Sequence, residues 1–164
     1  MWRCIAAGVL VTYLVAVFQS TLGGRIEIRG VSPDLVLVWT LCVGLVSGPQ
    51  AGVLAGFGGG LVEGALAQKL TAAFAISKLT SGFLAGLLAT RVFKEHWLAL
   101  VLGGIVLTLA NEVIFLAVSW GWGARHAGHV IGMRMLYHAA LTPAGFTLVS
   151  RARRSLRGRP GEVG

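Results

Sequence analysis

The chain alternates long apolar stretches with short polar connections. Six of these stretches approach the length of about 20 residues that a helix needs to cross a hydrocarbon core about 30 Å thick. They cover residues 4–22, 31–48, 51–67, 70–90, 97–120 and 130–150. Only the uncharged turn Ser47-Gly48-Pro49-Gln50 joins the second stretch to the third, which predicts a tight helical hairpin, with a re-entrant pair as the alternative. This pattern predicts an all-α integral membrane protein in which residues 1–150 form six transmembrane helices. Residues 151–164 are then expected to form a basic cytoplasmic tail.

The amino-acid composition is also typical of a chain that lies mainly in a lipid bilayer. Of its 164 residues, 55% are hydrophobic and only 12% are charged, and the mean hydropathy is +0.79. A soluble core of this size does not need so much apolar sequence. Cys4 and Cys42 lie in or beside apolar stretches, so neither a disulfide framework nor a cysteine metal site is expected.

The position of the basic residues along the chain decides how the net charge of +8 is interpreted. Five of the fourteen Lys and Arg residues lie in the tail, at Arg151, Arg153, Arg154, Arg157 and Arg159. No stacking aromatic residues accompany them, so nucleic acid is not the expected partner. A basic segment directly after an apolar helix is typical of a topology signal that also contacts anionic lipid headgroups.

The distribution of basic residues also predicts the orientation. If both termini lie on one side, that side carries eight Lys and Arg residues and the other side carries four. Besides the tail, the first side holds Arg3, Arg91 and Lys94, and the second holds Arg25, Arg29, Lys69 and Arg125. The excess predicts cytoplasmic termini. The tryptophans at predicted helix ends agree, because indole rings favour the headgroup region; these are Trp2, Trp97, Trp120 and Trp122.

Glycines recur every four residues in the third stretch, at Gly52, Gly56, Gly60 and Gly64. The fourth stretch has a matching small face that includes Gly82 and Gly86. Small residues at this spacing let two helix backbones approach closely. The pattern predicts that the third and fourth helices pack together; a homodimer seam is the alternative.

The charged, amide and imidazole side chains within the apolar stretches all fall toward the predicted outer side. Lys78, for example, lies eight residues into its stretch, about 12 Å deep at 1.5 Å per residue. We call this set the polar cluster: Gln19, Asp34, Glu63, Lys78, Asn111, Glu112, Arg134 and His138. Buried ions need partners, so we expect Glu63 and Glu112 to balance Lys78 and Arg134.

Two interpretations of the polar cluster remain open. In the first, it lines a pocket open to the outer face, with Arg134 facing Glu112 or Glu63. In the second, it is a set of ion pairs and hydrogen bonds that fixes the register of the helices.

Signals for catalysis or for a bound metal are weak. His126 and His129 are close in sequence, but no third ligand has suitable spacing for zinc. No glycine-framed serine, HExxH motif or phosphate loop is present. We therefore expect neither an enzyme nor a cofactor.

The order of several short motifs resembles the rod shape-determining protein family MreD. Phe18-Gln19-Ser20-Thr21 closes the first helix, and Pro33-Asp34-Leu35-Val36-Leu37 opens the second. Gly48, Gly52 and Gly56-Phe57 lead to Gly60-Leu61-Val62-Glu63, and Lys78-Leu79 leads to Gly82-Phe83-Leu84-Ala85-Gly86. The likeness covers about the first ninety residues. It departs at Glu63, where the family usually has Asp, and in the glycine-rich run from Gly58 to Gly60.

This resemblance implies a non-enzymatic, multi-pass component of the bacterial inner membrane that supports rod shape and lateral peptidoglycan synthesis. Its direct partner would be the single-span protein MreC, and its indirect partners MreB, RodA and a class B penicillin-binding protein. Gln19, Asp34 and Glu63 are preferred as partner residues by the resemblance, and Glu112, Arg134 and His138 by their depth.

The six-helix fold of this family is also similar to that of substrate-binding subunits of energy-coupling-factor vitamin transporters. The alternative function is therefore that of a small-solute transport subunit. Such a subunit would be expected to carry small residues four apart on its first helix. Here Ala6, Ala7 and Gly8 are followed at that spacing by Leu10, Val11 and Thr12.

Overall fold

The computed structural model describes residues 2–22, 27, 29–68, 70–91, 97–119 and 127–157. This part of the chain forms six α-helices: α1 (Trp2–Leu22), α2 (Leu35–Ser47), α3 (Pro49–Ala67), α4 (Thr71–Arg91), α5 (Trp97–Val118) and α6 (Ala127–Arg157). The expected all-helical class and six helices are therefore confirmed for the described residues. Several residues used to predict orientation and a zinc site lie outside them: Arg25, Lys69, Lys94, Trp120, Trp122, Arg125, His126 and Arg159.

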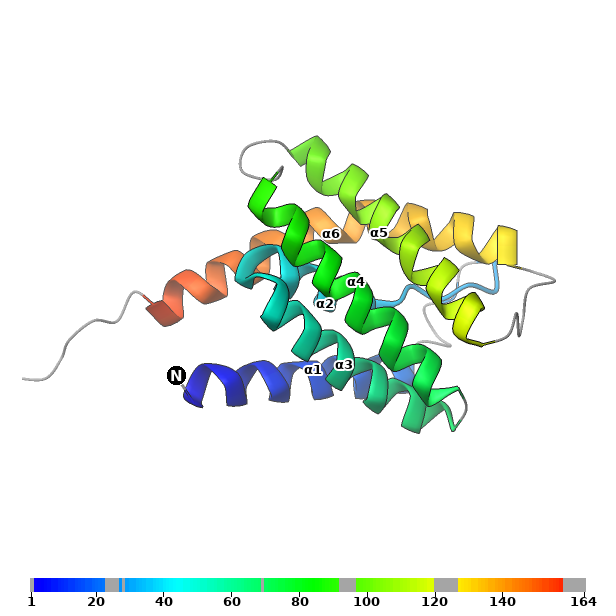
Figure 1. Cartoon of the computed structure of the whole chain (residues 1–164), viewed down its shortest axis with the longest axis horizontal. Coiled ribbons are helices and arrows are strands. Elements are labelled where there is room, and N and C mark those ends of the chain that lie inside the picture. Colours follow the sequence, from blue (N-terminus) through cyan, green and yellow to red (C-terminus); the bar gives the residue numbers. More distant parts are fainter. Residues whose placement is uncertain are drawn as a thin grey trace, which may run out of the picture.

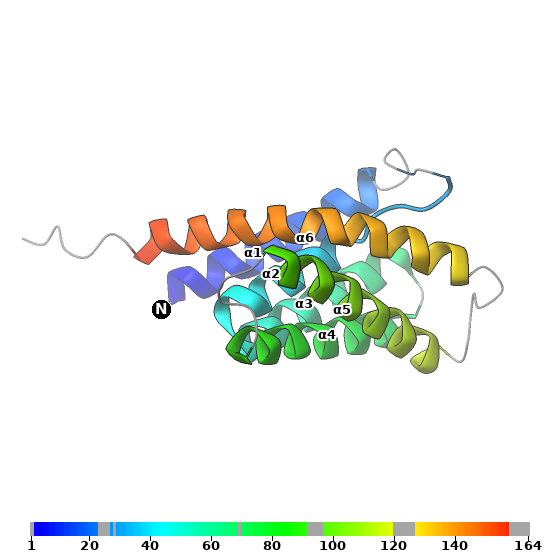
Figure 2. The same ribbon diagram turned by 90° about the horizontal axis from the view of Figure 1, so that it is seen from above.

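Successive helices run in opposite directions along the length of the molecule (Figure 1). The first turn of α1, the connection between α2 and α3 and the last turn of α6 lie at the same end (Figures 1 and 2). The N-terminal ends of α4 and α6 lie at the opposite end, and the shorter α2 begins nearer the middle of the molecule. We call these two ends the terminal end and the far end.

Helix α2 begins later than expected, at Leu35 rather than Val31. Pro33 disfavours helical geometry in the residue before it. Asp34 then caps the helix, because its side chain accepts a hydrogen bond of 2.8 Å from the Leu37 N–H. The resulting 13 residues are about 20 Å long, so the helical part of α2 is shorter than a hydrocarbon core.

Helix α6 differs in the other direction, because it continues past the expected end at Ser150 to Arg157. Residues 151–157 are thus helical, whereas we expected the basic tail to begin at 151. Arginine is a good helix former, and the next helix-breaking residue is Gly158. Basic side chains also interact favourably with the C-terminal end of a helix.

A single residue separates α2 from α3. Gly48 has φ 94° and ψ 176°, a backbone conformation that is almost restricted to glycine. Its N–H bonds the Gly44 carbonyl, and Pro49 occupies the first position of α3, where a helix needs no N–H donor. The expected tight hairpin of these two helices is therefore present.

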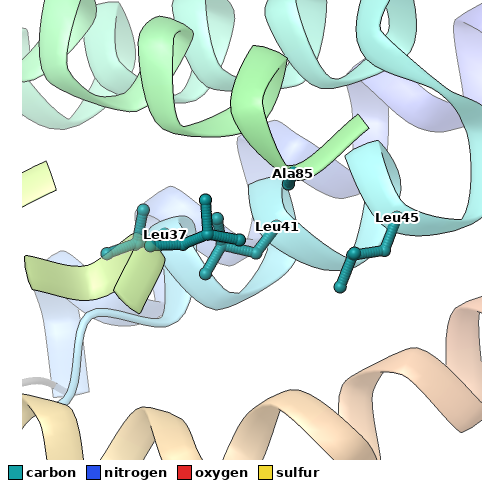
Figure 3. Close-up of a cluster of buried hydrophobic side chains, with 5 residues drawn as sticks. Leu37, Leu41, Leu45 and Ala85 are labelled. Carbon is teal, nitrogen blue, oxygen red and sulfur yellow. The ribbon is translucent and has the colours of Figure 1, made fainter. Parts of the chain in front are cut away.

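The short helix α2 lies at the centre and contacts each of the other five helices. Leu37, Leu41 and Leu45 follow one face of it and pack with Ala85 of α4 and Leu107 of α5 (Figure 3). All five side chains are buried. This apolar core fixes α2 against α4 and α5.

The glycines of α3 face the backbone of α4. A Cβ atom on Gly60 would lie 2.5 Å from the Phe74 carbonyl oxygen, and one on Gly64 would lie 2.5 Å from the Thr71 Cα. Added Cβ atoms on Gly52 and Gly56 would meet the backbone of Gly82 and Lys78. The glycine spacing is therefore used for the close packing of α3 and α4 within one chain.

Two helical segments of the described chain are long and apolar enough to cross a membrane: Thr71–Ala89 and Trp97–Val118. Gly8–Thr21 and Leu35–Ser47 are apolar but shorter. These lengths are compatible with a membrane protein.

Candidate functional site

The polar cluster gathers around the N-terminus of α2, and Asp34 is its centre. The Asp34 Oδ1 atom caps α2, and its Oδ2 atom lies 2.6 Å from Lys78 Nζ on α4. Its backbone N–H donates to His138 Nε2 on α6 at 3.2 Å. One residue thus joins three helices through three separate groups, and it is only 3% exposed.

Lys78 lies between two carboxylates. Besides Asp34, its ammonium group contacts Glu63 Oε2 on α3 at 2.9 Å. Lys78 is 1% exposed, and its Nζ atom lies 5.1 Å from the centre of the Phe74 ring. A cation within about 6 Å of a ring face is attracted by the ring quadrupole, so three groups stabilise this buried charge.

Gln19 connects the ion pairs to α1. Its Nε2 donates to Glu63 Oε1 at 2.8 Å, and its Oε1 accepts from the Val36 N–H at 2.9 Å. Val36 and Leu37 are in the first turn of α2, where backbone N–H groups have no partner within the helix. Gln19 and Asp34 therefore accept hydrogen bonds from the free N–H groups in the first turn of α2. The same two side chains also contact Glu63 and Lys78.

His138 is held by two partners with defined roles. Its Nε2 accepts from the Asp34 N–H, while its Nδ1 lies 2.8 Å from Thr108 Oγ1. The Thr108 hydroxyl donates to the Gly104 carbonyl at 2.6 Å, so its oxygen is left to accept. This network assigns a neutral imidazole with its proton on Nδ1.

Glu112 and Arg134 form a second ion pair, with 2.7 Å between Glu112 Oε1 and Arg134 Nη1. Glu112 is one of the two partners that the sequence predicts for Arg134. The two side chains differ in burial, since Glu112 is 6% and Arg134 29% exposed. This pair is therefore the more open part of the polar cluster.

Asn111 is buried beside Glu112 but does not join the ion pairs. Its Oδ1 lies 3.5 Å from the Ser81 hydroxyl oxygen, whose proton is donated to the Ser77 carbonyl at 2.8 Å. The distance is long for a hydrogen bond. Asn111 thus takes part in neither of the two groups of ion pairs in the polar cluster.

Three carboxylates in the polar cluster face two cations. Asp34, Glu63 and Glu112 are the acids, and Lys78 and Arg134 are the bases. The N-terminus of α2 adds N–H donors and the positive end of a helix dipole next to Asp34. This end of α2 thus offsets part of the excess negative charge.

The arrangement is suited to holding helices together. Side chains of α1, α3, α4 and α6 meet at the start of α2, and side chains of α5 pair with those of α6. Within the described residues, no group of three or more His, Cys, Asp and Glu side chains is placed to hold a metal ion. An open pocket at the outer face stays a prediction.

Two residues of this site escaped the sequence reasoning, Thr108 and Phe74. Thr108 lies one turn before Glu112 on α5, and Phe74 lies one turn before Lys78 on α4. Residues four apart share a helix face, so this spacing was an available signal. Phe74 also packs on Phe115, with the ring centres 4.9 Å apart, and so covers the charged residues.

Comparison of the chain with protein families, with curated proteins and with solved structures gave no match.

Proposed function

We propose that the chain is a six-helix protein of the bacterial inner membrane that acts as a scaffold of the MreD kind. In this proposal it binds a single-span MreC-like partner and supports rod shape without catalysing a reaction. The partner would connect it to MreB, RodA and a class B penicillin-binding protein.

The observation that carries the membrane part is an inverted distribution of polarity. Lys78, Asp34 and Glu112 are buried, whereas large apolar side chains are exposed on the outside. On α5 the exposed residues recur along one face: Leu98, Leu102, Val106, Leu109 and Val113, each more than two-fifths exposed. Water would oppose such an exterior, and a lipid environment favours it.

The alternating helix directions support six crossings with both termini on one side. The far end then faces the periplasm, and the terminal end faces the cytoplasm (Figure 1). The short α2 reaches the far end through the buried residues Val31 and Asp34 that precede it. Because α2 is enclosed by other helices, its short length leaves little backbone facing lipid.

The scaffold part is supported by the closed state of the polar cluster. A solute bound by the polar cluster would need room there, but Lys78, Asp34 and His138 are almost fully buried against one another. A network of this kind fixes the helices, so the exterior keeps one shape for a partner. The proposal of an MreC-like partner comes from the resemblance of the sequence motifs to the MreD family.

The test is affinity purification of the tagged full-length chain from native membranes in mild detergent, followed by identification of the bound proteins. We expect an MreC-like single-span protein, and we expect cells depleted of this chain to lose their rod shape. Recovery of the energising subunits of a vitamin transporter, with no MreC-like protein, would contradict the scaffold proposal.

A further inference from the structure

An apolar groove follows α2 between α1 and α6. It has a volume of about 430 Å³. Its lining comes from three helices and includes Val15 of α1, Trp39 and Cys42 of α2, and Gly145, Leu148 and Val149 of α6. We call it the α1–α6 groove. It shares no residue with the polar cluster.

The floor and one wall of the groove are firmly packed. At the floor, α6 packs closely on α2 at Gly145, because a Cβ atom there would lie 2.8 Å from Cys42 Sγ. Trp39 donates from Nε1 to Thr12 Oγ1 at 2.8 Å, which connects α1 to α2 along the groove. The groove therefore belongs to the folded chain and is not a gap between loosely placed helices.

The terminal end of the groove is basic. Arg151 follows Leu148 by three residues and Arg153 follows Val149 by four, so both continue the groove face of α6. Side chains on a helix tilt toward its N-terminus, which here means toward the groove. Arg153 also donates to the Val46 carbonyl, so it lies beside this end of α2.

Two arginines flank this end of the groove. Arg151 is exposed and Arg153 is half-buried, and the guanidinium group of Arg153 has further N–H donors besides the one that bonds the Val46 carbonyl. Arg154 is also exposed, but it is neither three nor four residues from a lining residue of α6 and so lies on the opposite side of this helix. No acidic side chain of the described residues pairs with Arg151 or Arg153. An apolar channel that ends at unpaired arginines complements a molecule with a hydrocarbon chain and an anionic head.

We propose that the α1–α6 groove binds an acyl chain of an anionic phospholipid and that Arg151 and Arg153 hold its phosphate. This inference rests on the proposed membrane placement, in which the basic end faces the cytoplasmic leaflet. The phospholipid is a structural ligand of the inner leaflet and does not reach the polar cluster.

The size of the groove favours a lipid chain over a partner helix. A helix with its side chains is about 10 Å across and rises 1.5 Å per residue, which is roughly 120 Å³ for each residue. The groove would hold about one turn of such a helix. A narrow acyl chain fits within it and brings its headgroup to the arginines.

The test uses the purified full-length chain, delipidated in detergent and titrated with phosphatidylglycerol or phosphatidylethanolamine of identical acyl chains. Native mass spectrometry counts the bound lipids. We expect phosphatidylglycerol to bind more tightly. Arg151→Gln and Arg153→Gln should each weaken that binding roughly fivefold, whereas Arg154→Gln, which removes an exposed arginine on the opposite side of α6, should have no effect.

A second pair of variants tests the groove itself. Val15→Phe places a larger apolar side chain in the groove and should reduce binding of both lipids, whereas Val106→Phe on the exposed face of α5 should not. Thermal unfolding checks that each variant is folded, and the arginine variants decide the matter if Val15→Phe is not.

Three outcomes would overturn the inference. Equal binding of the two lipids would remove the role of the arginines, and unchanged binding in all groove and arginine variants would remove the site. If Val15→Phe instead abolished capture of a single-span protein and left lipid binding intact, the groove would be a helix-docking site. Because the lipid assay contains no partner protein, loss of the scaffold function would not alter its result.

Discussion

The Nζ atom of Lys78 lies 2.6 Å from Oδ2 of Asp34, which connects the middle of α4 to the residue that caps α2. Both side chains are almost completely buried. An ion pair in such a place is costly to break, because the remaining charge has no water to replace its partner. The stability of the fold should therefore depend on both members together.

Replacement of Lys78 by Met should lower the free energy of unfolding by about 3–5 kcal/mol, since Asp34 and Glu63 then lose their shared cation. Unfolding of the purified protein in detergent measures the change. The double variant Asp34→Asn/Lys78→Met should regain part of the loss, because Asn keeps the helix cap and removes one charge. A double variant no more stable than Lys78→Met would contradict the importance of this ion pair.

The ion pair between Glu112 and Arg134 should be energetically coupled. In a double-mutant cycle with Glu112→Gln and Arg134→Gln, we expect a coupling of about 0.5–3 kcal/mol, toward the lower limit because Arg134 is 29% exposed. Arg154→Gln is the control, since this exposed arginine bonds only its own helix. Additive effects of the two changes would show that the contact contributes nothing to stability.

Thr108→Val should lower the free energy of unfolding by about 1–3 kcal/mol. It removes the acceptor of the His138 Nδ1–H in a fully buried place, and an unpaired buried donor is costly. Thr147→Val removes a hydroxyl that bonds its own helix in an exposed position, so it should change stability by less than about 0.5 kcal/mol. Equal effects of the two variants would argue against the assigned hydrogen-bond network.

Gly82→Ala should separate α3 from α4. A Cβ atom there meets the Gly52 carbonyl group and lies 2.8 Å from Thr40 Cγ2, and the backbone of α3 must then move. We expect a loss of about 1–3 kcal/mol, as for other overpacked sites. Gly58→Ala is the matched control: open space surrounds it, and alanine in a helix should add about 0.5–1 kcal/mol. Stabilisation by both changes would contradict close packing at Gly82.

The orientation is tested with a thiol reagent that does not cross membranes. Gln68→Cys, at the far end after α3, should be labelled in intact cells, whereas Ser47→Cys, at the terminal end of α2, should be labelled only after permeabilisation. The unsubstituted chain, with Cys4 and Cys42, gives the background. Labelling of Ser47→Cys alone in intact cells would reverse the proposed orientation.

The residue pattern alone was sufficient to predict six helices, the α2–α3 hairpin and the packing of α3 on α4. Each of these depends on interactions close in sequence or on the four-residue repeat of a helix, which the order of residues shows directly. The common depth of the polar cluster was also predictable, because depth follows from counting residues along each helix.

Only the tertiary structure decided which of these residues meet. Depth does not give rotation about the helix axis, so the pairing of Lys78 with Asp34, the support of His138 by Thr108 and the separation of Asn111 could not be derived. The α1–α6 groove likewise exists because α1 and α6 lie on either side of α2, a relation between segments more than a hundred residues apart. The order of neighbouring residues determines where each helix begins and ends. The rotation of each helix about its own axis depends on the packing free energy of all six helices together.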